Sequence, residues 1–442
     1  MTDRIDDTHR ADVASWVESA QTAGTDFPIQ NLPVGRFRAP GRDTRCGVAI
    51  GDQVLDLVAV RAAELLDGDN ASMVDACVRD GSLNPLLEAG REAMTRLRRA
   101  VSALLRADTP ANARARSLAG ALLVPVKDAT MLLPARVGDY TDFYASIHHA
   151  TNVGSMFRPD NALLPNYKWV PIGYHGRASS LVASGTPVRR PDGQTRNDAA
   201  SPPTFGASRR LDYELEVGAY IGTGTMLGQT ISLESAESHV AGLCLVNDWS
   251  ARDIQSWEYQ PLGPFLAKNF ATTVSPWIVT LDALAPFRVP AFVRAEGDPR
   301  PLPYLQAEAN DRAGGFAINL EVLLSSRRMR EAGMPPMQVS AGSFTSMYWT
   351  VAQLVTHHAS NGCNLRPGDL LASGTVSGAT KESRGCLLER TWKGTEPLAL
   401  PTGEQRGFLE DGDEVIMRGW CERAGYRRIG FGEARGEVVG WS

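Results

Sequence analysis

The sequence from about residue 130 onward limits the fold most strongly, because short β-type runs alternate there with glycine and proline over roughly three hundred residues. Typical runs are LDYELEVGAYI, WIVTL and DEVIMRGW. This pattern predicts a large, strand-dominated domain. The change of texture follows LLVPVKDATMLLPARVGD, so we predict a first domain over residues 1–132 and a second over residues 133–442.

The first domain is predicted to be a small β-rich unit. In CGVAIGDQVLDL, two strand-like runs meet at Gly51 and Asp52, a dipeptide suited to a two-residue hairpin turn. Apolar residues recur at helical spacing over residues 85–107, with charges between them. That stretch predicts a surface helix packed on the unit.

Composition excludes several functional classes. The net charge is −5 over 442 residues and the pI is near 5.9, so nothing suggests binding to nucleic acid or to an anionic membrane. The polar start of the chain lacks the apolar core of a secretory signal, and no run is apolar enough to span a bilayer, so we expect a cytoplasmic protein. The six cysteines form no CxxC pair, which favours reduced core cysteines over a zinc knuckle or a disulfide framework.

Three acidic residues alternate with apolar ones in LDYELEVG. A strand would place Asp212, Glu214 and Glu216 on one face, where they repel one another unless a cation lies between them. The alternative is an edge strand with a solvated polar face. The apolar run before Asp248 places another carboxylate at a strand end. With Asp142, oxygen ligands are then available for a hard divalent cation, Mg²⁺ or Ca²⁺, and zinc is less favoured.

A helix is predicted through ARDIQSWEYQ, with Ser250 and Asp253 as a capping box. Arg252, Gln255 and Tyr259 would share one face of it, where a cation, an amide and a phenol could stabilise an oxyanion. A solvated polar face is the alternative. Nearby, Lys268 lies alone in an apolar run, and a buried lysine needs a partner or a function.

Two adjacent histidines lie in DYTDFYASIHHATNVG. If the chain is helical from about Asp142, His149 falls at i+7 on the same face, whereas His148 is turned about 100° away. His149 is therefore a candidate general base, with a structural, hydrogen-bonded histidine as the alternative. Arg158 and Tyr174 follow in a glycine-containing loop whose backbone could approach a ligand.

Histidines elsewhere in the chain have simpler interpretations. His357 and His358 end the apolar-periodic stretch MYWTVAQLVTHH, where imidazoles suit the C-terminal end of a helix dipole. His175 belongs to the same glycine-containing loop as Tyr174.

Long motifs resemble the fumarylacetoacetase (fumarylacetoacetate hydrolase) family across most of residues 125–442. They are DYTDFYASIHHATNVG, LLPNYKWVPIGYHGRASS, LDYELEVG, VNDWSARDIQSWEYQPLGPFLAKNFATTVSPW and NGCNLRPGDLLASGTVSG, in this order. The resemblance implies a mostly β fold, with an N-terminal SH3-like barrel followed by a mixed β-sandwich roll. It also implies a homodimer.

The resemblance assigns roles to individual positions. It implies metal ligands at Asp142, Glu214, Glu216 and Asp248, a nearby cation site completed by Lys268 and Thr272, a base His149 oriented by Glu389, oxyanion donors Arg252, Gln255 and Lys268, and substrate contacts at Tyr144, Arg158, Tyr174, Tyr259 and Thr375. One position departs from the family, which has a glutamine where this chain has His148.

The implied reaction is hydrolysis of the carbon–carbon bond of 4-fumarylacetoacetate to fumarate and acetoacetate, the last step of tyrosine and phenylalanine catabolism. This small, dianionic 1,3-dicarbonyl needs a base for water, donors for a tetrahedral oxyanion and a Lewis acid for the departing enolate. Two alternatives stay open. The same scaffold could serve an acylpyruvate hydrolase, a decarboxylase or a hydratase. The chain could also be a catalytically idle binding or structural protein that keeps a metal for stability.

Overall fold

The computed structural model describes residues 5–109, 112–196 and 200–441. Helices and strands take similar shares of the described residues, about 29% and 27%, so the structure confirms a sheet-rich fold but a mixed one rather than a mostly β one. Amphipathic helices of the N-terminal third account for much of the helix content that a mostly β protein would lack. The α-helices are α1 (Leu57–Ala62), α2 (Gly68–Asp80), α3 (Asn84–Glu88), α4 (Gly90–Leu105), α5 (Ala113–Ser117), α6 (Ala119–Leu122), α7 (Ile147–Phe157), α8 (Arg252–Glu258), α9 (Leu281–Leu284), α10 (Glu308–Ala313), α11 (Arg327–Glu331), α12 (Val351–Ala359) and α13 (Leu387–Arg390).

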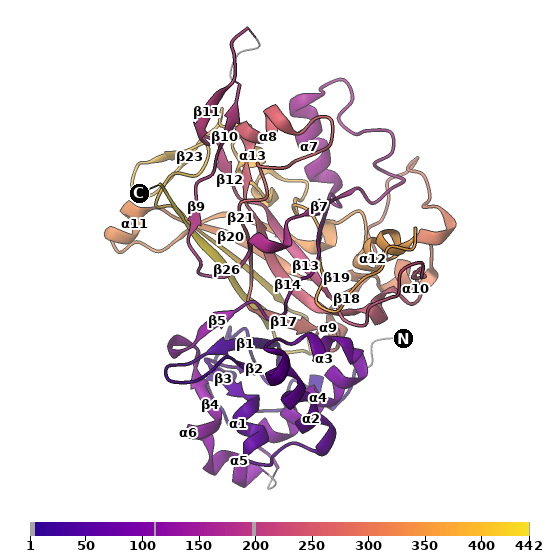
Figure 1. Ribbon diagram of the computed structural model, residues 1–442, viewed down its shortest axis with the longest axis vertical. Helices are drawn as coiled ribbons and strands as arrows, with labels where there is room; N and C mark the ends of the chain where they lie inside the picture. The colour runs from indigo at the N-terminus through magenta and orange to yellow at the C-terminus, as the bar shows by residue number, and fades with distance from the viewer. Residues whose placement is uncertain (1–4, 110–111, 197–199, 442) are drawn as a thin grey trace.

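A 13-stranded mixed sheet runs through both ends of the molecule (Figure 1). Its main order is β4 (Leu123–Pro125), β3 (Gln53–Asp56), β2 (Arg45–Ile50), β1 (Val34–Arg38), β17 (Trp277–Thr280), β14 (Val240–Asp248), β13 (Leu215–Ile221), β22 (Leu370–Ala372), β6 (Tyr140–Phe143) and β7 (Gly173–Gly176). Off this path, β5 (Thr130–Leu132) pairs with β1, and β16 (Thr272–Val274) lies between β14 and β8 (Leu181–Ala183).

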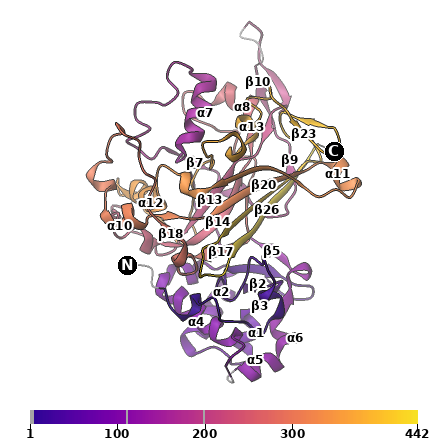
Figure 2. The ribbon, with the colours of Figure 1, turned by 180° about the vertical axis from the view of Figure 1, so that it is seen from behind.

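The N-terminal strands do not close on themselves. Within the described ranges, β1 continues into the rest of the sheet by antiparallel pairing with β17, and no strand pair completes a barrel. The SH3-like barrel is therefore not seen as a closed barrel. The division at residue 132 stays a prediction, although Figures 1 and 2 show the elements up to β5 gathered at one end of the molecule.

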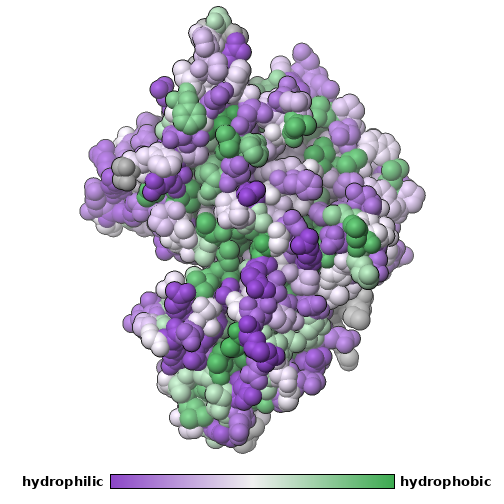
Figure 3. Space-filling view, viewed as in Figure 1, coloured by the Kyte–Doolittle hydropathy of each residue, from purple (hydrophilic) through white to green (hydrophobic). Residues whose placement is uncertain are grey.

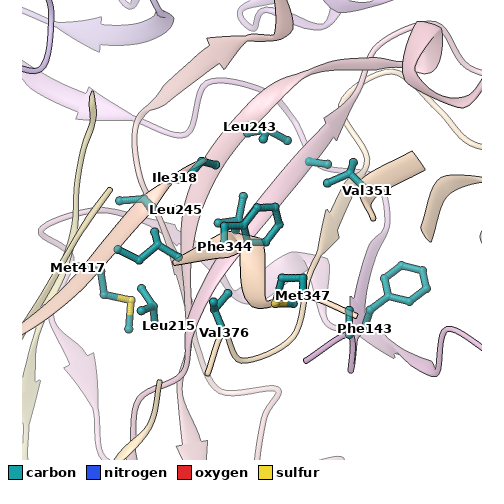
Figure 4. Close-up of a cluster of buried hydrophobic side chains, with 14 of the residues drawn as sticks. Phe143, Leu215, Leu243, Leu245, Ile318, Phe344, Met347, Val351, Val376 and Met417 are labelled. Atoms are coloured by element: carbon teal, nitrogen blue, oxygen red, sulfur yellow. The ribbon is translucent and has the colours of Figure 1, made fainter. Parts of the chain in front are cut away.

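A second sheet has five strands: β21 (Met337–Ser343), β20 (Asn319–Ser325), β25 (Glu414–Cys421), β26 (Ile429–Val439) and β9 (Val188–Arg189). Four two-stranded pairs complete the strands: β10 (Asp192–Thr195) with β11 (Thr204–Ala207), β12 (Leu211–Asp212) with β15 (Ser250–Ala251), β18 (Arg288–Val289) with β19 (Gly315–Phe316), and β23 (Leu398–Ala399) with β24 (Gln405–Arg406). Figure 4 shows part of the core, where Leu215, Leu243 and Leu245 lie near Ile318 and Met417. This buried apolar layer holds β13 and β14 rigidly, and both strands lead to the site.

Local predictions for residues 1–132 are confirmed. β2 and β3 form the hairpin, and Gly51 takes the left-handed conformation that its turn requires, with φ of 58°. The predicted helix at residues 85–107 is divided at Ala89 into α3 and α4. The apolar face of α4 is buried against the core through Ala93, Met94, Leu97, Val101 and Leu105.

One face of the surface, the length and apolarity of the helices, and the cysteines bear on the functional classes. Polar and apolar residues are interspersed over the face in Figure 3. In the described part of the chain, no helix has both the length and the apolarity needed to cross a membrane. All six cysteines are free, and five of them are buried, as expected for reduced core residues.

Candidate active site

Four carboxylates from different parts of the chain meet at one edge of the large sheet. Glu216 lies in β13 and Glu214 directly before it, while Asp248 ends the neighbouring strand β14. Asp142 lies in β6, which β22 joins to β13. The four are almost completely buried, and their carboxylate oxygens lie within 4.8 Å of one another. The sequence predicted this grouping, and the solvated-edge alternative is wrong for these residues.

Two buried cations compensate part of this charge. The Lys268 ammonium contacts Glu214 and lies 2.7 Å from Asp248 Oδ2, and Arg252 Nη2 lies 2.7 Å from Glu214 Oε1. Burial raises the pKa of Glu214, but the charges of Lys268 and Arg252 outweigh it, so the pKa is lowered. Lys268 therefore has the partners that its burial demands.

Asp142 and Glu216 lack comparable partners. Burial and the charge of Asp248 raise the pKa of Asp142 well above its usual value, and burial and the charge of Asp142 do the same for Glu216. Asp142 Oδ1 and Glu216 Oε1 are buried and accept no hydrogen bond from the described residues. Such orphaned oxygens are costly unless a cation neutralises them. The donor set is all oxygen, and this fits a hard divalent ion.

Backbone geometry completes this side of the site. Gly374 N–H donates to Glu216 Oε2 over 3.2 Å. Its φ is 77°, and an added Cβ would lie 2.1 Å from the Phe143 carbonyl oxygen, so only glycine allows the approach. Thr272 and Tyr174 donate their hydroxyls to Asp248, each over 2.8 Å. These contacts hold Asp248 in one orientation.

Asp212 does not belong to the cluster, which corrects the prediction that it shares a face with Glu214 and Glu216. The strand is interrupted between β12 and β13, and this changes the alternation. Asp212 instead accepts from Arg252 Nε over 2.9 Å and from the backbone N–H groups of Leu387 and Leu388 over 2.7 and 3.0 Å. It thus connects Arg252 to the first turn of α13, which carries Glu389.

His149 and Glu389 form a buried pair. His149 Nδ1 lies 2.6 Å from Glu389 Oε2, and the two residues are 240 positions apart in the chain. The prediction of a helix from Asp142 is wrong, because that residue is in strand β6 and α7 begins at Ile147. Ser146 caps α7 by accepting from His149 N–H over 3.3 Å. His149 is nevertheless the buried histidine of the two.

Three residues that the sequence interpretation missed surround Glu389. Asn152 Nδ2 donates to Oε1 over 2.7 Å, Ser377 Oγ donates to Oε2 over 2.8 Å, and Cys386 Sγ lies 3.2 Å from Oε2. Burial raises the pKa of Glu389, but the charge of His149 and these hydrogen bonds lower it to about 2. The ionised carboxylate assigns the Nδ1 proton to His149 and leaves Nε2 to accept another.

His148 is turned away from this pair. Its ring packs against Phe292, with centroids 6.4 Å apart, and partial burial lowers its pKa. Tyr144 instead lies edge-on to the His149 ring, with a centroid separation of 5.2 Å. His357 and His358 lie in the last turn of α12, as predicted, and His358 contacts Thr141 rather than the carboxylates.

The predicted helix after Asp248 is confirmed as α8, but its capping box is wrong. Ser250 pairs in β15, and Ala251 precedes the helix without a side-chain cap. Arg252 Nη1 donates to Gln255 Oε1 over 3.1 Å, so the NH₂ end of this amide is the one that can donate to a ligand. Tyr259 lies just beyond α8, 39% exposed.

The remaining predicted contact residues differ in position. Thr375 is buried, and its hydroxyl has no hydrogen-bond partner in the part of the chain that the structure describes. Arg158 is exposed at the end of α7, where its guanidinium donates to the Ala162 carbonyl over 3.5 Å. A pocket of about 180 Å³ opens beside the cluster, and its lining includes Tyr174, Asp248, Lys268 and Thr272. The pocket gives a small ligand access to this side of the site.

Comparison with known proteins gives consistent matches along the chain. The protein-family model for the fumarylacetoacetate hydrolase C-terminal region matches residues 139–439. The family model for the fumarylacetoacetase N-terminal region matches residues 30–134. The chain is 50% identical over 420 residues to the fumarylacetoacetase of Homo sapiens, covering 94% of this chain and 96% of that one. It is 48% identical over 432 residues to that of Dictyostelium discoideum, covering 96% and 97%. A solved fumarylacetoacetate hydrolase from Exiguobacterium antarcticum has a similar fold, with a TM-score of 0.50 and 18% identity over 93% of this chain and 100% of that one.

Proposed function

The chain belongs to the fumarylacetoacetase family, and we propose that it hydrolyses the carbon–carbon bond of 4-fumarylacetoacetate, giving fumarate and acetoacetate. The observation that carries this proposal is the buried His149–Glu389 pair beside a carboxylate cluster with two orphaned oxygens. The His149–Glu389 pair can supply a general base, and the carboxylate cluster can bind a cation.

His149 acts as the general base. Glu389 fixes the proton on Nδ1, so Nε2 can take a proton from the attacking water. The four donors on Glu389 hold that carboxylate in one rotamer and keep it ionised, which stabilises the imidazolium formed during attack. When carbon–carbon cleavage follows, the imidazolium can return the proton to the departing carbon.

Arg252, Gln255 and Lys268 receive the tetrahedral oxyanion. Contacts with Asp212, Glu214 and Asp248 already orient the two cations, so little reorganisation is needed as negative charge develops. The NH₂ group of Gln255 adds a neutral donor on the same helix as Arg252. Each such donor typically contributes about 3 kcal/mol to transition-state stabilisation.

Asp142, Glu214, Glu216 and Asp248 would hold Mg²⁺ or Ca²⁺, with Lys268 and Thr272 completing the nearby cation site. When bound, such an ion acts as a Lewis acid towards the 1,3-dicarbonyl oxygens and stabilises the enolate leaving group. The substrate contacts we propose are Tyr144, Arg158, Tyr174, Tyr259 and Thr375. Arg158 would have to turn inward from its exposed position to bind a substrate carboxylate.

For the whole molecule we propose the family organisation. An SH3-like β unit over residues 1–132 would precede a catalytic β-roll over residues 133–442, in a cytoplasmic homodimer. Exposed apolar side chains at Leu262, Phe265 and Leu266 support an association surface near the pocket. Analytical ultracentrifugation tests the dimer, and a monomer at micromolar concentration would contradict it.

A spectrophotometric assay with fumarylacetoacetate tests the proposed reaction. We expect the substrate absorbance to disappear with stoichiometric formation of fumarate and acetoacetate. Turnover of an acylpyruvate, with fumarylacetoacetate untouched, would contradict the proposal in favour of another reaction on this scaffold.

A further inference from the structure

A second group of metal-ligating side chains lies beside the four-carboxylate cluster and shares no residue with it. His149, Cys386 and Glu389 offer a nitrogen, a sulfur and an oxygen atom that lie within 4.8 Å of one another. All three side chains are buried, with 3% exposure for His149 and none for the other two. The proposed reaction uses His149 and Glu389 directly, whereas the Cys386 thiol serves there only as one of the four donors to Glu389.

The three ligand types differ from those of the carboxylate cluster. Thiolate and imidazole ligands favour Zn²⁺ and related thiophilic ions, whereas carboxylates alone suit Mg²⁺ and Ca²⁺. We propose that His149, Cys386 and Glu389 form an inhibitory site for a thiophilic divalent cation such as Zn²⁺ or Cd²⁺. The two sites would then select different ions from the same solution.

The distances between the three atoms are close to what such an ion needs. Zinc bonds of about 2.0–2.3 Å place neighbouring tetrahedral ligands roughly 3.3–3.7 Å apart. The Cys386 Sγ to Glu389 Oε2 distance is already 3.2 Å. The His149 Nδ1 to Oε2 distance is 2.6 Å and would have to open by about 0.7 Å, so binding requires a small shift between α7 and α13.

Binding would change the protonation of the base. The ion takes the Nδ1 lone pair, the proton of Nδ1 moves to Nε2, and the thiol proton leaves to solvent, so one proton is released per ion. A histidine that carries its proton on Nε2 cannot accept another from water. Loss of turnover therefore follows from binding; this consequence rests on the proposed function, whereas the binding itself does not.

The test uses Cd²⁺ as the probe on the full chain kept in excess Mg²⁺, which occupies the oxygen-ligand cluster. Cadmium bound to a thiolate gives a charge-transfer absorption in the ultraviolet that oxygen ligands do not give. We expect one such site per chain, with turnover lost in parallel with the absorption. Absence of the absorption at saturating Cd²⁺ would overturn the proposal and leave binding at the carboxylates only.

Cys386→Ser keeps a hydroxyl beside Glu389 but removes the sulfur, so the absorption should disappear. The Cd²⁺ concentration for half-maximal inhibition should rise at least about 10-fold, relative to the activity of that variant without Cd²⁺. The matched control is Cys363→Ser, which removes the half-buried cysteine, the one most accessible to a stray ion, and should keep the absorption. Full absorption in Cys386→Ser would overturn the proposal.

Cadmium NMR of the unmodified chain serves as the second measurement if Cys386→Ser does not fold. A resonance in the range of mixed sulfur and nitrogen ligands supports the site, and resonances only in the all-oxygen range overturn it. The outcome is separable from the proposed function. Cadmium–thiolate absorption without hydrolysis of fumarylacetoacetate would contradict the reaction alone, and hydrolysis without that absorption would contradict the metal site alone.

Discussion

Replacing Lys268 with methionine should destabilise the metal-free protein strongly. Its ammonium contacts Glu214 and Asp248 in a site where all three groups are at least nine-tenths buried. Methionine keeps a similar length and removes the charge, so four buried carboxylates would share only Arg252. Removing one partner of a buried ion pair typically costs about 3–5 kcal/mol, and we expect the free energy of unfolding to fall by that amount in excess chelator.

A divalent cation should restore much of this loss, because it supplies the missing positive charge. At an ion concentration about 100 times the dissociation constant, binding to the folded state alone adds about 2.7 kcal/mol. Urea unfolding of Lys268→Met with chelator and with Mg²⁺ measures both quantities, provided that the slope with denaturant stays constant. The variant should therefore gain stability with Mg²⁺ even if its turnover stays low.

Lys381→Met is the matched control. Lys381 pairs with Glu396 on the surface, where the two side chains are 40% and 55% exposed. Such a pair contributes at most about 1 kcal/mol to the free energy of unfolding. Mg²⁺ should therefore not change the stability cost of Lys381→Met. A cost below 1 kcal/mol for Lys268→Met, or a cost unaffected by Mg²⁺, would refute our account of charge compensation in the cluster.

Three further predictions follow from the site. Chelation should abolish turnover and Mg²⁺, Ca²⁺ or Mn²⁺ should restore it, whereas full activity in a preparation shown to be free of metal would contradict the cation role. Arg158→Ala should raise KM about 10-fold or more through loss of a charge-assisted pair, and unchanged kcat and KM would leave this exposed residue without a role in binding. The pKa of Glu389 is lowered from 4.5 to about 2, so its ionised form contributes stability above about pH 4.5 that is lost as the pH falls through about 2. That contribution is about 3 kcal/mol, so the free energy of unfolding should fall less steeply with falling pH in Glu389→Gln than in the unmodified chain. The same pH dependence in both proteins below about pH 4.5 would contradict this prediction.

The sequence predicts those parts of the site that depend on short-range pattern. Glu216 and Asp248 could be placed because one alternates within a strand and the other ends an apolar run, and both strands form as expected. Asp212 was misplaced because the alternation assumes an unbroken strand, and the chain changes partners between β12 and β13. The interruption depends on tertiary pairing with β15, which periodicity does not report.

The base pair could not be derived from spacing. Glu389 lies 240 residues from His149, so the resemblance to a family, rather than the pattern, placed them together. Asn152 could have been found, since it follows His149 by three residues on α7 and so shares its face. Ser377 gave no such signal, because it lies in a segment without regular structure that only the folded chain brings to Glu389.

The fold shows the same division between local and long-range information. The hairpin at Gly51 and the helices α4 and α12 follow from turn chemistry and apolar spacing. The pairing of β1 with β17 joins segments more than two hundred residues apart, and neither strand carries a mark of its partner. The sequence therefore could not show that the N-terminal strands join the large sheet and do not close into a separate barrel.

The most direct test of the account compares the two adjacent histidines as alanine variants with fumarylacetoacetate as substrate. Loss of a general base typically costs about 100- to 10,000-fold, so His149→Ala should lower kcat by at least 100-fold with little change in KM. His148→Ala should keep most of the activity, because its ring packs on Phe292 away from Glu389. An inactive His148→Ala beside an active His149→Ala, both folded and metal-loaded, would contradict the assignment of the base.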